Sequence, residues 1–416
     1  MRILFLTDNF PPEVNAPASR TFEHCREWVR ADHQVTVITG APNFPKGRLF
    51  PGYRNRLWQR ETLDGIDVVR VWTYIAANQG VVKRTLDYLS FMVTGFLAGL
   101  FQRRPDVIVG TSPQFLTNCA AWMLSVFRWR PFVFELRDLW PESIKTVGRD
   151  ERLGGDLRLL ERLELFLYRR AAVVVAVTES FRRNLVARGI DPEQDRRGHS
   201  TGLISAASNP LARDPELAER FGLAGKFVAG YIGTHGMAHA LETVLDAAAR
   251  IRALPEGADV RFVLLGDGAS KESLKKTAET MGLDTVLFLD TVPKEDVPRY
   301  WSLLDVSIIH LRKADNFTQV IPSKLFEGMG MGIPVLHGVA GESAGIVERE
   351  GVGLAFEPEN VGALCEGVLR LARDRTLYER LRTRCLEAAP RYDRTARARE
   401  LLAILEQVAT PAPRSA

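Results

Sequence analysis

Cysteine is scarce in this sequence of 416 residues, and the four that occur, Cys25, Cys119, Cys365 and Cys385, are scattered along it. No two of them form a Cys-x-x-Cys pair, so the spacing suits neither a disulfide framework nor a zinc site and is typical of a reducing cytoplasm. A strong net charge is also missing, because 55 basic residues oppose 51 acidic ones. The formal charge of +4 is too small to indicate a nucleic-acid partner.

Long apolar runs are missing as well. The apolar run that opens the chain, at residues 3–6, is short and is ended by Asp8 and by Pro11-Pro12. It does not resemble a signal peptide, and we expect a first buried strand there. A later apolar run, at residues 89–101, is shorter than the ~20 residues that a helix needs to span a bilayer.

Short apolar runs alternate with amphipathic helical stretches along most of the chain, which is the pattern of parallel α/β sheets. In the first half, this pattern predicts strands at residues 3–7, 35–39, 68–71, 107–110, 132–136 and 172–178. Turn-forming pairs such as Asp-Pro and Asn-Pro predict a linker at residues 189–215. The second series of predicted strands comprises residues 227–232, 260–265, 286–289, 306–309, 333–336 and 354–356.

The predicted fold class is therefore α/β, with two doubly wound Rossmann-like domains that face a central cleft. We expect an amino-terminal domain at residues 1–205, a second domain at 206–390, and a terminal helix and tail at 391–416. Ligands of such sheets bind beyond the carboxyl ends of the strands, so candidate sites are expected at these ends.

One segment, residues 83–104, combines an apolar run with basic pairs at both ends, Lys83-Arg84 and Arg103-Arg104. This arrangement is expected of a helix that lies in a membrane interface and is attracted by anionic lipids. A second apolar patch with basic neighbours, at residues 122–130, would extend the surface. A well-buried core helix is the alternative, and the sequence leaves both open.

The strongest local signal for a site is the run Ile321-Pro-Ser-Lys-Leu-Phe-Glu327. Proline suits the first turn of a helix, where free N–H groups and the positive end of the helix dipole favour an anion. Lys324 would add a positive charge beside a diphosphate. Glu327, about one turn further on, is placed to accept the hydroxyls of a ribose. The alternative is an ordinary amphipathic helix with a solvated lysine and glutamate.

Glycine gathers at the same predicted edge. Gly328 and Gly330 interrupt the expected helix, where each costs ~1 kcal/mol relative to alanine. Two further groups, Gly266-Asp267-Gly268 and Gly233-Thr234-His235-Gly236, each follow a predicted buried strand. Glycine is expected where a ligand approaches the backbone closely, although a simple turn also explains each group. Three such features in one domain favour a nucleotide site.

The run Val320–Val335, with Gly341-Glu-Ser-Ala-Gly345, resembles the donor motif of family 4 retaining glycosyltransferases of the GT-B fold, and the resemblance covers essentially the whole chain. Three motifs, Phe10–Glu13, Glu135–Ser143 and Tyr231–His239, are similar to a narrower branch. This is the L-fucosamine (FucNAc) transferase-like branch of O-antigen, capsule and lipopolysaccharide biosynthesis.

The resemblance implies a retaining, metal-independent transfer without a cofactor, from a UDP-linked N-acetylated deoxyhexosamine such as FucNAc. The acceptor would be an undecaprenyl-diphosphate-linked saccharide. The protein is then expected to be cytoplasmic and peripherally associated with the inner membrane. The resemblance also implies a terminal helix that crosses back to the amino-terminal domain.

The resemblance implies roles for particular residues. Glu327 would bind the donor ribose, and the amides of Ser323 and Lys324 would bind its diphosphate. Arg137 and Asp138 would lie against the donor sugar and, with Lys324, carry the catalysis. The remaining expected donor contacts are Gly266, Asp267, Gly268 and Val292 around the nucleobase, Thr234 and His235 near the phosphates, and Asn15 and Ala16 near the sugar and phosphates.

The sequence departs from the family pattern in three places. Gln319 stands where many members carry a glutamate, eight residues before Glu327. The usual arginine and lysine after the first strand of the second domain are replaced by Thr234, His235 and Met237. Lys324, Arg312 and Lys313 are then the candidates to meet the phosphate charge. Residues 198–210 also lack the Asn-Gly-Val/Ala-Asp loop of relatives.

Two other functions are compatible with these motifs. A UDP-sugar 2-epimerase has the same two-domain architecture and needs no membrane surface. A degenerate, non-catalytic, membrane-associated member would keep the fold and lose affinity for nucleotides, and the atypical segment 198–210 is the reason to consider it.

Overall fold

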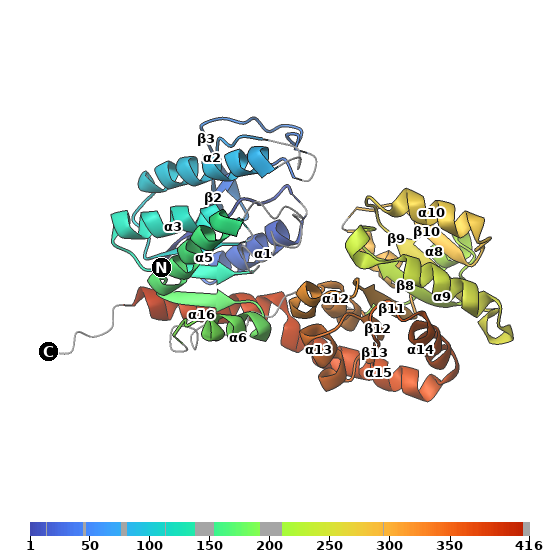
Figure 1. Cartoon of the computed structure of the whole chain (residues 1–416). Helices are drawn as coiled ribbons and strands as arrows, with labels where there is room; N and C mark the ends of the chain where they lie inside the picture. The colour runs from blue at the N-terminus through green and yellow to red at the C-terminus, as the bar shows by residue number, and fades with distance from the viewer. Residues whose placement is uncertain are drawn as a thin grey trace. The chain divides into compact units, whose positions relative to one another are not determined.

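The structure is a computed structural model of the chain and describes residues 1–13, 15–44, 47–75, 81–112, 114–137, 154–191, 210–293 and 295–410. The chain divides into two compact units, Met1–Gly202 with Arg394–Ala416, and Leu203–Asp393. Each unit contains a largely or wholly parallel sheet with helices packed on it (Figure 1). The predicted class, α/β with two Rossmann-like sheets, is confirmed.

The sheet of the first unit is built from β1 (Arg2–Leu6), β2 (Gln34–Gly40), β3 (Trp58–Leu63), β4 (Ile66–Val71), β5 (Val107–Thr111), β6 (Phe132–Leu136) and β7 (Val173–Ala176). The strands pair in the order β3-β4-β2-β1-β5-β6-β7. Strands β5, β6 and β7 are buried at every residue, because helices cover both faces of a parallel sheet. From β1 the sheet is extended in one direction by β2 and β4 and in the other by β5, β6 and β7. The switch point of this sheet therefore lies between β1 and β5.

Two cores lie on the two faces of this sheet. One contains the buried sides of α2 (Val81–Leu100), α3 (Phe115–Arg128), α5 (Gly154–Arg170) and α6 (Glu179–Ala187), and the other contains α1 (Ala16–Arg30). Helix α2 packs closely on α3, because Gly99 faces Leu124: a Cβ at position 99 would lie 2.4 Å from Leu124 Cδ1. This close contact fixes which face of α2 is buried.

The second unit has six parallel strands: β8 (Phe227–Ile232), β9 (Val260–Leu265), β10 (Val286–Leu289), β11 (Val306–His310), β12 (Val335–Gly338) and β13 (Gly353–Ala355). They pair in the order β10-β9-β8-β11-β12-β13. The order therefore reverses between β8 and β11. Ligands of open α/β sheets bind at such a switch point, so the loops after β8 and β11 are the first place to look for a site.

The helices of the second unit are α8 (Pro215–Arg220), α9 (Glu242–Arg252), α10 (Lys271–Thr280), α11 (Val297–Trp301), α12 (Lys324–Gly330), α13 (Glu342–Glu350), α14 (Val361–Arg373) and α15 (Arg375–Ala388). Helix α12 follows β11 and so starts beside the switch point. The preceding segment is a short 3-10 helix, Asp315–Gln319, that contains Gln319.

The last helix, α16 (Arg394–Ala409), belongs to the first unit although it follows the second in the sequence. It packs along α1, where Trp28 Nε1 donates a hydrogen bond of 2.7 Å to the carbonyl of Ala398 (Figure 1). Leu401 and Leu405 are completely buried in the core that α1 shares with the sheet. The terminal helix therefore returns to the amino-terminal unit, as the resemblance implied.

Two elements differ from the sequence-based expectations. Strand β3 was not predicted, because its residues Trp58–Leu63 are largely polar and it runs antiparallel to β4 at the edge of the sheet. Helix α3 begins at Phe115, whereas the sequence predicted only an apolar patch at residues 122–130. Residues 192–209, which include most of the atypical segment 198–210, lie outside the described residues.

The packing of α16 predicts that the first unit depends on it for stability. Leu405→Ala removes a fully buried side chain and should lower the free energy of unfolding by ~2–5 kcal/mol. Gln407→Ala, at an exposed position of the same helix, should change it by less than about 0.5 kcal/mol. Urea denaturation of the full chain compares the two. Equal midpoints for both variants would contradict the packing of α16 into this core.

Candidate active site

The loops after β8 and β9 pack backbone against backbone at the carboxyl edge of the second sheet. A Cβ at Gly266 would lie 1.9 Å from the carbonyl oxygen of Gly233, and one at Gly268 would lie 2.6 Å from that of His235. The His235 amide donates to the Asp267 carbonyl at 2.9 Å. Both glycines also have positive φ values, so only glycine fits at these positions. Their tight packing therefore has a structural cause that needs no ligand.

Lys271, for which the sequence analysis predicted no role, stabilises the same edge of the sheet through hydrogen bonds. Its buried Nζ donates to the carbonyl of Gly266 at 2.7 Å and to that of Leu289 at 3.2 Å, and it pairs with Asp290 at 2.5 Å. It thus satisfies the carbonyl groups at the ends of β9 and β10. A lysine at the start of a helix gives no sequence signal for this role, because its partners come from two different strand ends.

Lys324 lies at the switch point, as the sequence predicted for a phosphate-binding residue. Its Nζ is 3.6 Å from the centre of the Tyr231 ring, and a Cβ at Gly233 would lie 2.6 Å from Nζ. Within the described part of the chain, no carboxylate forms an ion pair with it. Burial lowers the pKa of Lys324 to about 7, although the nearby Glu327 opposes this shift. A lysine without a carboxylate partner here is available to an anionic ligand.

The other predicted residues of this helix lie beside Lys324. Ser323 precedes the first residue of α12, and its amide and that of Lys324 form no hydrogen bond with any described residue. Glu327 is half-buried, and its carboxylate has no hydrogen-bond partner in the described ranges. Two amides, one ammonium and one carboxylate are thus free on one short segment.

The two histidines of the loop after β8 are neutral at physiological pH. His235 is completely buried, and burial together with Lys271 and Lys324 lowers its pKa to about 4. Burial and Lys324 lower the pKa of His239 to about 4 as well. The His235 ring lies inside the unit, so its side chain carries no positive charge near neutral pH. The phosphate contact expected of this imidazole stays a prediction.

His310, at the end of β11, links this loop by hydrogen bonds to the segment that follows β13. Its Nδ1 donates to the carbonyl of His239 at 2.8 Å, and its Nε2 accepts from the amide of Glu359 at 2.9 Å. These two bonds define a neutral tautomer with the proton on Nδ1. Lys313 pairs with Glu357 at 2.5 Å, so this candidate for the phosphate charge is already engaged, whereas Arg312 is exposed.

The residues predicted around the nucleobase lie in the loops that follow β9 and β10. Asp267 is exposed, and its carboxylate accepts the amide of Gly268 at 2.8 Å. Val292 is half-buried and packs against the core formed by α8, α11 and the sheet. Thr234 is exposed, and its carbonyl accepts the Tyr231 hydroxyl at 2.8 Å. These residues all lie at the carboxyl edge of β8, β9 and β10.

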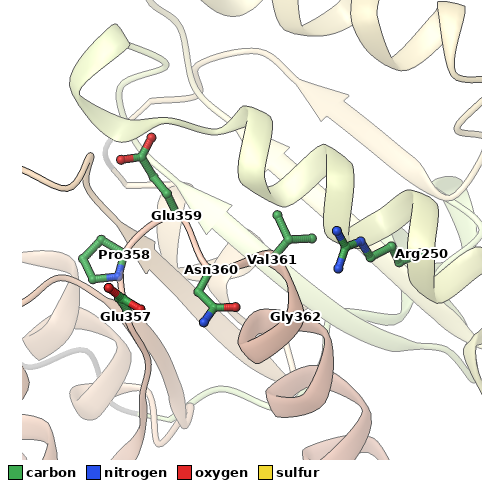
Figure 2. Close-up of a pocket in the computed structure, with 7 residues that line it drawn as sticks. All are labelled: Arg250, Glu357, Pro358, Glu359, Asn360, Val361 and Gly362. Carbon is green, nitrogen blue, oxygen red and sulfur yellow. The ribbon is translucent and has the colours of Figure 1, made fainter.

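A pocket of about 500 Å³ opens elsewhere on this unit, between α9 and the start of α14 (Figure 2). Its lining residues are Arg250, Glu357, Pro358, Glu359, Asn360, Val361 and Gly362. None of the predicted site residues lines it. Its two carboxylates are engaged by Lys313, through the ammonium at Glu357 and through the backbone amide at Glu359. We therefore assign the candidate donor site to the switch point.

In the first unit, the predicted residues lie at the carboxyl edge of its sheet. Asn15 caps α1: its Oδ1 accepts from the Ala18 amide at 2.8 Å, and its Nδ2 donates to Asn9. Ala16 is the first residue of that helix. Arg137 follows β6, and its buried Nε and Nη1 have no hydrogen-bond partner among the described residues. Asp138 lies outside the described residues.

Three carboxylates that the sequence analysis did not single out as site residues gather at this edge: Asp8, Glu13 and Asp87. Burial raises the pKa of Asp8, which follows β1, although Arg137 opposes the shift. Burial, Asp8 and Glu13 together raise the pKa of Asp87 on α2 to about 7. Glu13 itself accepts three backbone amides, including those of Asn43 and Phe44 at 2.8 Å each. Asp8 and Glu13 bracket the motif Phe10-Pro-Pro, which the sequence analysis used only as a family signature.

The segment predicted to face a membrane forms α2 and the turn after it. One side of α2 is buried through Phe91 and Ala98, but Val93 and Leu97 are each 49% exposed, and Phe101 is 79% exposed. Phe127 and Trp129 extend this apolar surface from α3, and the ring of Phe127 lies 5.4 Å from that of Phe96. No helix in the described ranges is both long and apolar enough to cross a membrane.

The structure has two doubly wound units, a terminal helix that returns to the first unit, and a lysine at the second switch point that has no carboxylate partner among the described residues. These features define a two-domain α/β protein with a candidate anion site. Comparison with known families gives the particular assignment. Residues 15–196 match the model of a glycosyl transferase 4-like domain, and residues 226–374 match that of glycosyl transferases group 1. Together the two models span most of the chain, which therefore belongs to the family of GT-B glycosyltransferases.

Individual relatives agree with this assignment. The colanic acid biosynthesis glycosyl transferase WcaI of Escherichia coli K12 is 26% identical over 383 residues, 88% of this chain and 91% of that protein. Sucrose-phosphate synthase of Thermosynechococcus elongatus has the same fold, with a TM-score of 0.76 at 16% identity over 98% of both chains. HepE of Anabaena, solved with UDP, matches 98% of this chain and 100% of its own with a TM-score of 0.67 and 16% identity.

The two lysines of the site should affect stability in opposite directions. Lys324→Met removes an ammonium whose pKa is depressed to about 7, so the folded state is penalised below pH 7 and relieved as pH rises toward 10.5. We expect the variant to gain about 1 kcal/mol at pH 6.5 and less at pH 9.5. Lys271→Met breaks hydrogen bonds to two strand ends and should lose ~1–3 kcal/mol. Thermal unfolding at both pH values measures these changes, and destabilisation by Lys324→Met at pH 6.5 would contradict them.

Proposed function

We propose that the chain is a retaining glycosyltransferase that takes its sugar from a UDP-sugar bound at the switch point of the second unit. The observation that carries the proposal is the Lys324 ammonium, which has no carboxylate partner among the described residues. It lies beside the amides of Ser323 and Lys324, which form no hydrogen bond with any described residue. A nucleoside diphosphate supplies the negative charge that such a group of donors accepts. Relatives of the same family transfer sugars, and HepE was solved with UDP.

In this proposal Glu327 accepts the two ribose hydroxyls, since its carboxylate has no other partner among the described residues. The backbone of Gly266, Asp267 and Gly268, with Val292, frames the nucleobase. Lys324 then remains beside the diphosphate as it leaves and stabilises the charge that develops on it, which is the electrostatic mode of catalysis. Transfer needs no metal in this scheme, because the ammonium and the amides take that role.

In the first unit, the proposal gives Arg137 and Asp138 the role of contacting the sugar, and it gives Asn15 and Ala16 roles near the sugar and phosphates. Two donors of the Arg137 guanidinium, Nε and Nη1, have no partner among the described residues, and its charge opposes the rise in the pKa of Asp8. Hydroxyl groups of a saccharide accept from such donors and donate to such carboxylates. We propose a FucNAc-like N-acetylated deoxyhexosamine as the sugar, from the branch that the motifs Phe10–Glu13 and Tyr231–His239 resemble.

The acceptor side of the proposal rests on α2. An exposed stripe of Leu89, Val93 and Leu97 between Lys83-Arg84 and Arg103-Arg104 suits the interface of an anionic membrane. We therefore propose that the protein docks on the inner membrane from the cytoplasm and transfers to an undecaprenyl-diphosphate-linked saccharide of a surface polysaccharide. WcaI, whose name assigns it to colanic acid biosynthesis, supports this class of product.

The two alternatives predict different measurements. A UDP-sugar 2-epimerase would also bind UDP but would not need the exposed stripe of α2, and both matching family models describe glycosyl transferases. A degenerate member would keep the fold without affinity for UDP. Nucleotide binding and vesicle binding together distinguish the three.

Donor binding is the first test. Titration calorimetry should detect UDP binding to the full chain, and Glu327→Ala should weaken it at least tenfold, because hydrogen bonds to a charged group contribute about 1.5–3 kcal/mol. Glu348→Ala, at an exposed position of α13, is the matched control and should leave the affinity unchanged. If the wild-type chain does not bind UDP, the proposed transferase is wrong and the degenerate member is favoured.

Membrane docking is tested by vesicle flotation. The wild-type chain should float with vesicles that contain anionic phospholipids, and less so at high salt. Val93→Glu with Leu97→Glu should abolish flotation, because two carboxylates enter the apolar stripe. Leu159→Glu, which changes an exposed leucine of α5, is the control and should float like the wild type. A wild-type chain that stays with the free protein would contradict membrane docking without affecting the UDP result.

A further inference from the structure

Tyr231 lies beneath Lys324, and the sequence motifs gave it no role. It is the fifth of six residues of β8, it is completely buried, and its ring is held in the core between the sheet and α9. The Lys324 Nζ lies 3.6 Å from the ring centre. This distance is well within the ~6 Å at which a cation is attracted by the face of an aromatic ring.

The surroundings leave the ammonium little room to move. The α-carbon of Gly233 borders it so closely that a Cβ at that position would lie 2.6 Å from Nζ and 2.7 Å from Cε. The rings of His235 and His239 pack against Tyr231 at 5.9 and 5.7 Å between centres. Both imidazoles are uncharged near neutral pH, and Glu327 is the one carboxylate that influences the charge of Lys324 among the described residues.

The ring and the hydroxyl of Tyr231 have separate contacts. The hydroxyl donates to the carbonyl of Thr234 at 2.8 Å and so holds the loop of residues 233–236. The ring face contacts Lys324. A substitution that removes only the hydroxyl can therefore be compared with one that removes the ring.

A ring face suits a lysine that must later bind a diphosphate. A carboxylate partner would hold the ammonium as well, but it would compete with the phosphates for the charge. A neutral aromatic face attracts the cation weakly and leaves its hydrogen-bond donors free. The ammonium is then held in position, and its hydrogen-bond donors are available to a phosphate.

We propose that Tyr231 is a positioning residue of the donor site, whose ring holds the Lys324 ammonium at the switch point where the diphosphate binds. This inference rests on the proposed function, because it assumes that a nucleoside diphosphate is the ligand. In this inference, the effect of Tyr231 on donor affinity comes from its ring and not from its hydroxyl.

The test compares UDP affinity at pH 6.5 in Tyr231→Phe, Tyr231→Leu and the wild type. Tyr231→Phe should bind like the wild type, because the ring is kept. Tyr231→Leu should lose about threefold to thirtyfold in affinity, the range of a cation–π contact. Phe262→Leu, in the same core on β9, is the control for lost packing and should bind UDP like the wild type.

A second measurement does not need the ligand. Protons attached near Nζ lie above the ring and should resonate upfield, so ¹³C-methylation of the lysines should give one ring-shifted signal that disappears in Lys324→Arg. We expect this signal to persist in Tyr231→Phe and to vanish in Tyr231→Leu. A wild-type spectrum without it would overturn the inference, even if Tyr231→Leu were too unstable to study.

The outcomes separate the two proposals. If the wild type binds UDP and Tyr231→Leu binds it equally well, the positioning role is wrong and the donor site stands. If Tyr231→Phe loses as much affinity as Tyr231→Leu, the hydroxyl and its loop are responsible, and the inference is also wrong. If the wild type does not bind UDP, the proposed function fails, and the inference on donor affinity fails with it.

Discussion

The candidate donor site depends on the way in which two strand-end loops of the second unit interlock. The carbonyl of Gly233 occupies the space beside Gly266, and the backbone of His235 occupies the space beside Gly268. Lys271 binds the carbonyls at the ends of β9 and β10 and closes this edge. Because the backbone is fixed, Tyr231 and Gly233 form a defined surface for Lys324. Without this interlock the ammonium would have no fixed place at the switch point.

The site also shows how charge is distributed between stability and function. Lys271 is buried with hydrogen bonds and an ion pair, so its charge serves the fold. Lys324 has no carboxylate partner within the described ranges, and burial depresses its pKa to about 7. A group that costs stability in the free protein and has unused donors is typical of a binding site. Arg137 in the first unit follows the same pattern, because two of its buried donors have no partner in the described part of the chain.

Much of this could be predicted from residues that are close in the sequence. The apolar runs predicted β6, β8, β9 and β10 with the observed bounds, because strands buried on both faces are nearly continuous in apolar residues. The motif Pro322–Glu327 likewise predicted a helix start beside a ligand edge, and Lys324 lies there. Strand β3 could not be predicted, since its polar residues pair only with β4 at the sheet edge.

By itself, the sequence determined the class of fold, the family and the short segment that carries Ser323, Lys324 and Glu327, because each depends on local patterns. Only the tertiary structure decided that His235 is buried and neutral, that Lys271 closes the strand ends, and that Tyr231 lies beneath Lys324. The residues of each such contact are far apart in the chain or lie on different strand ends. Their burial and charge arise when the parallel strands bring those ends together, which no local pattern contains.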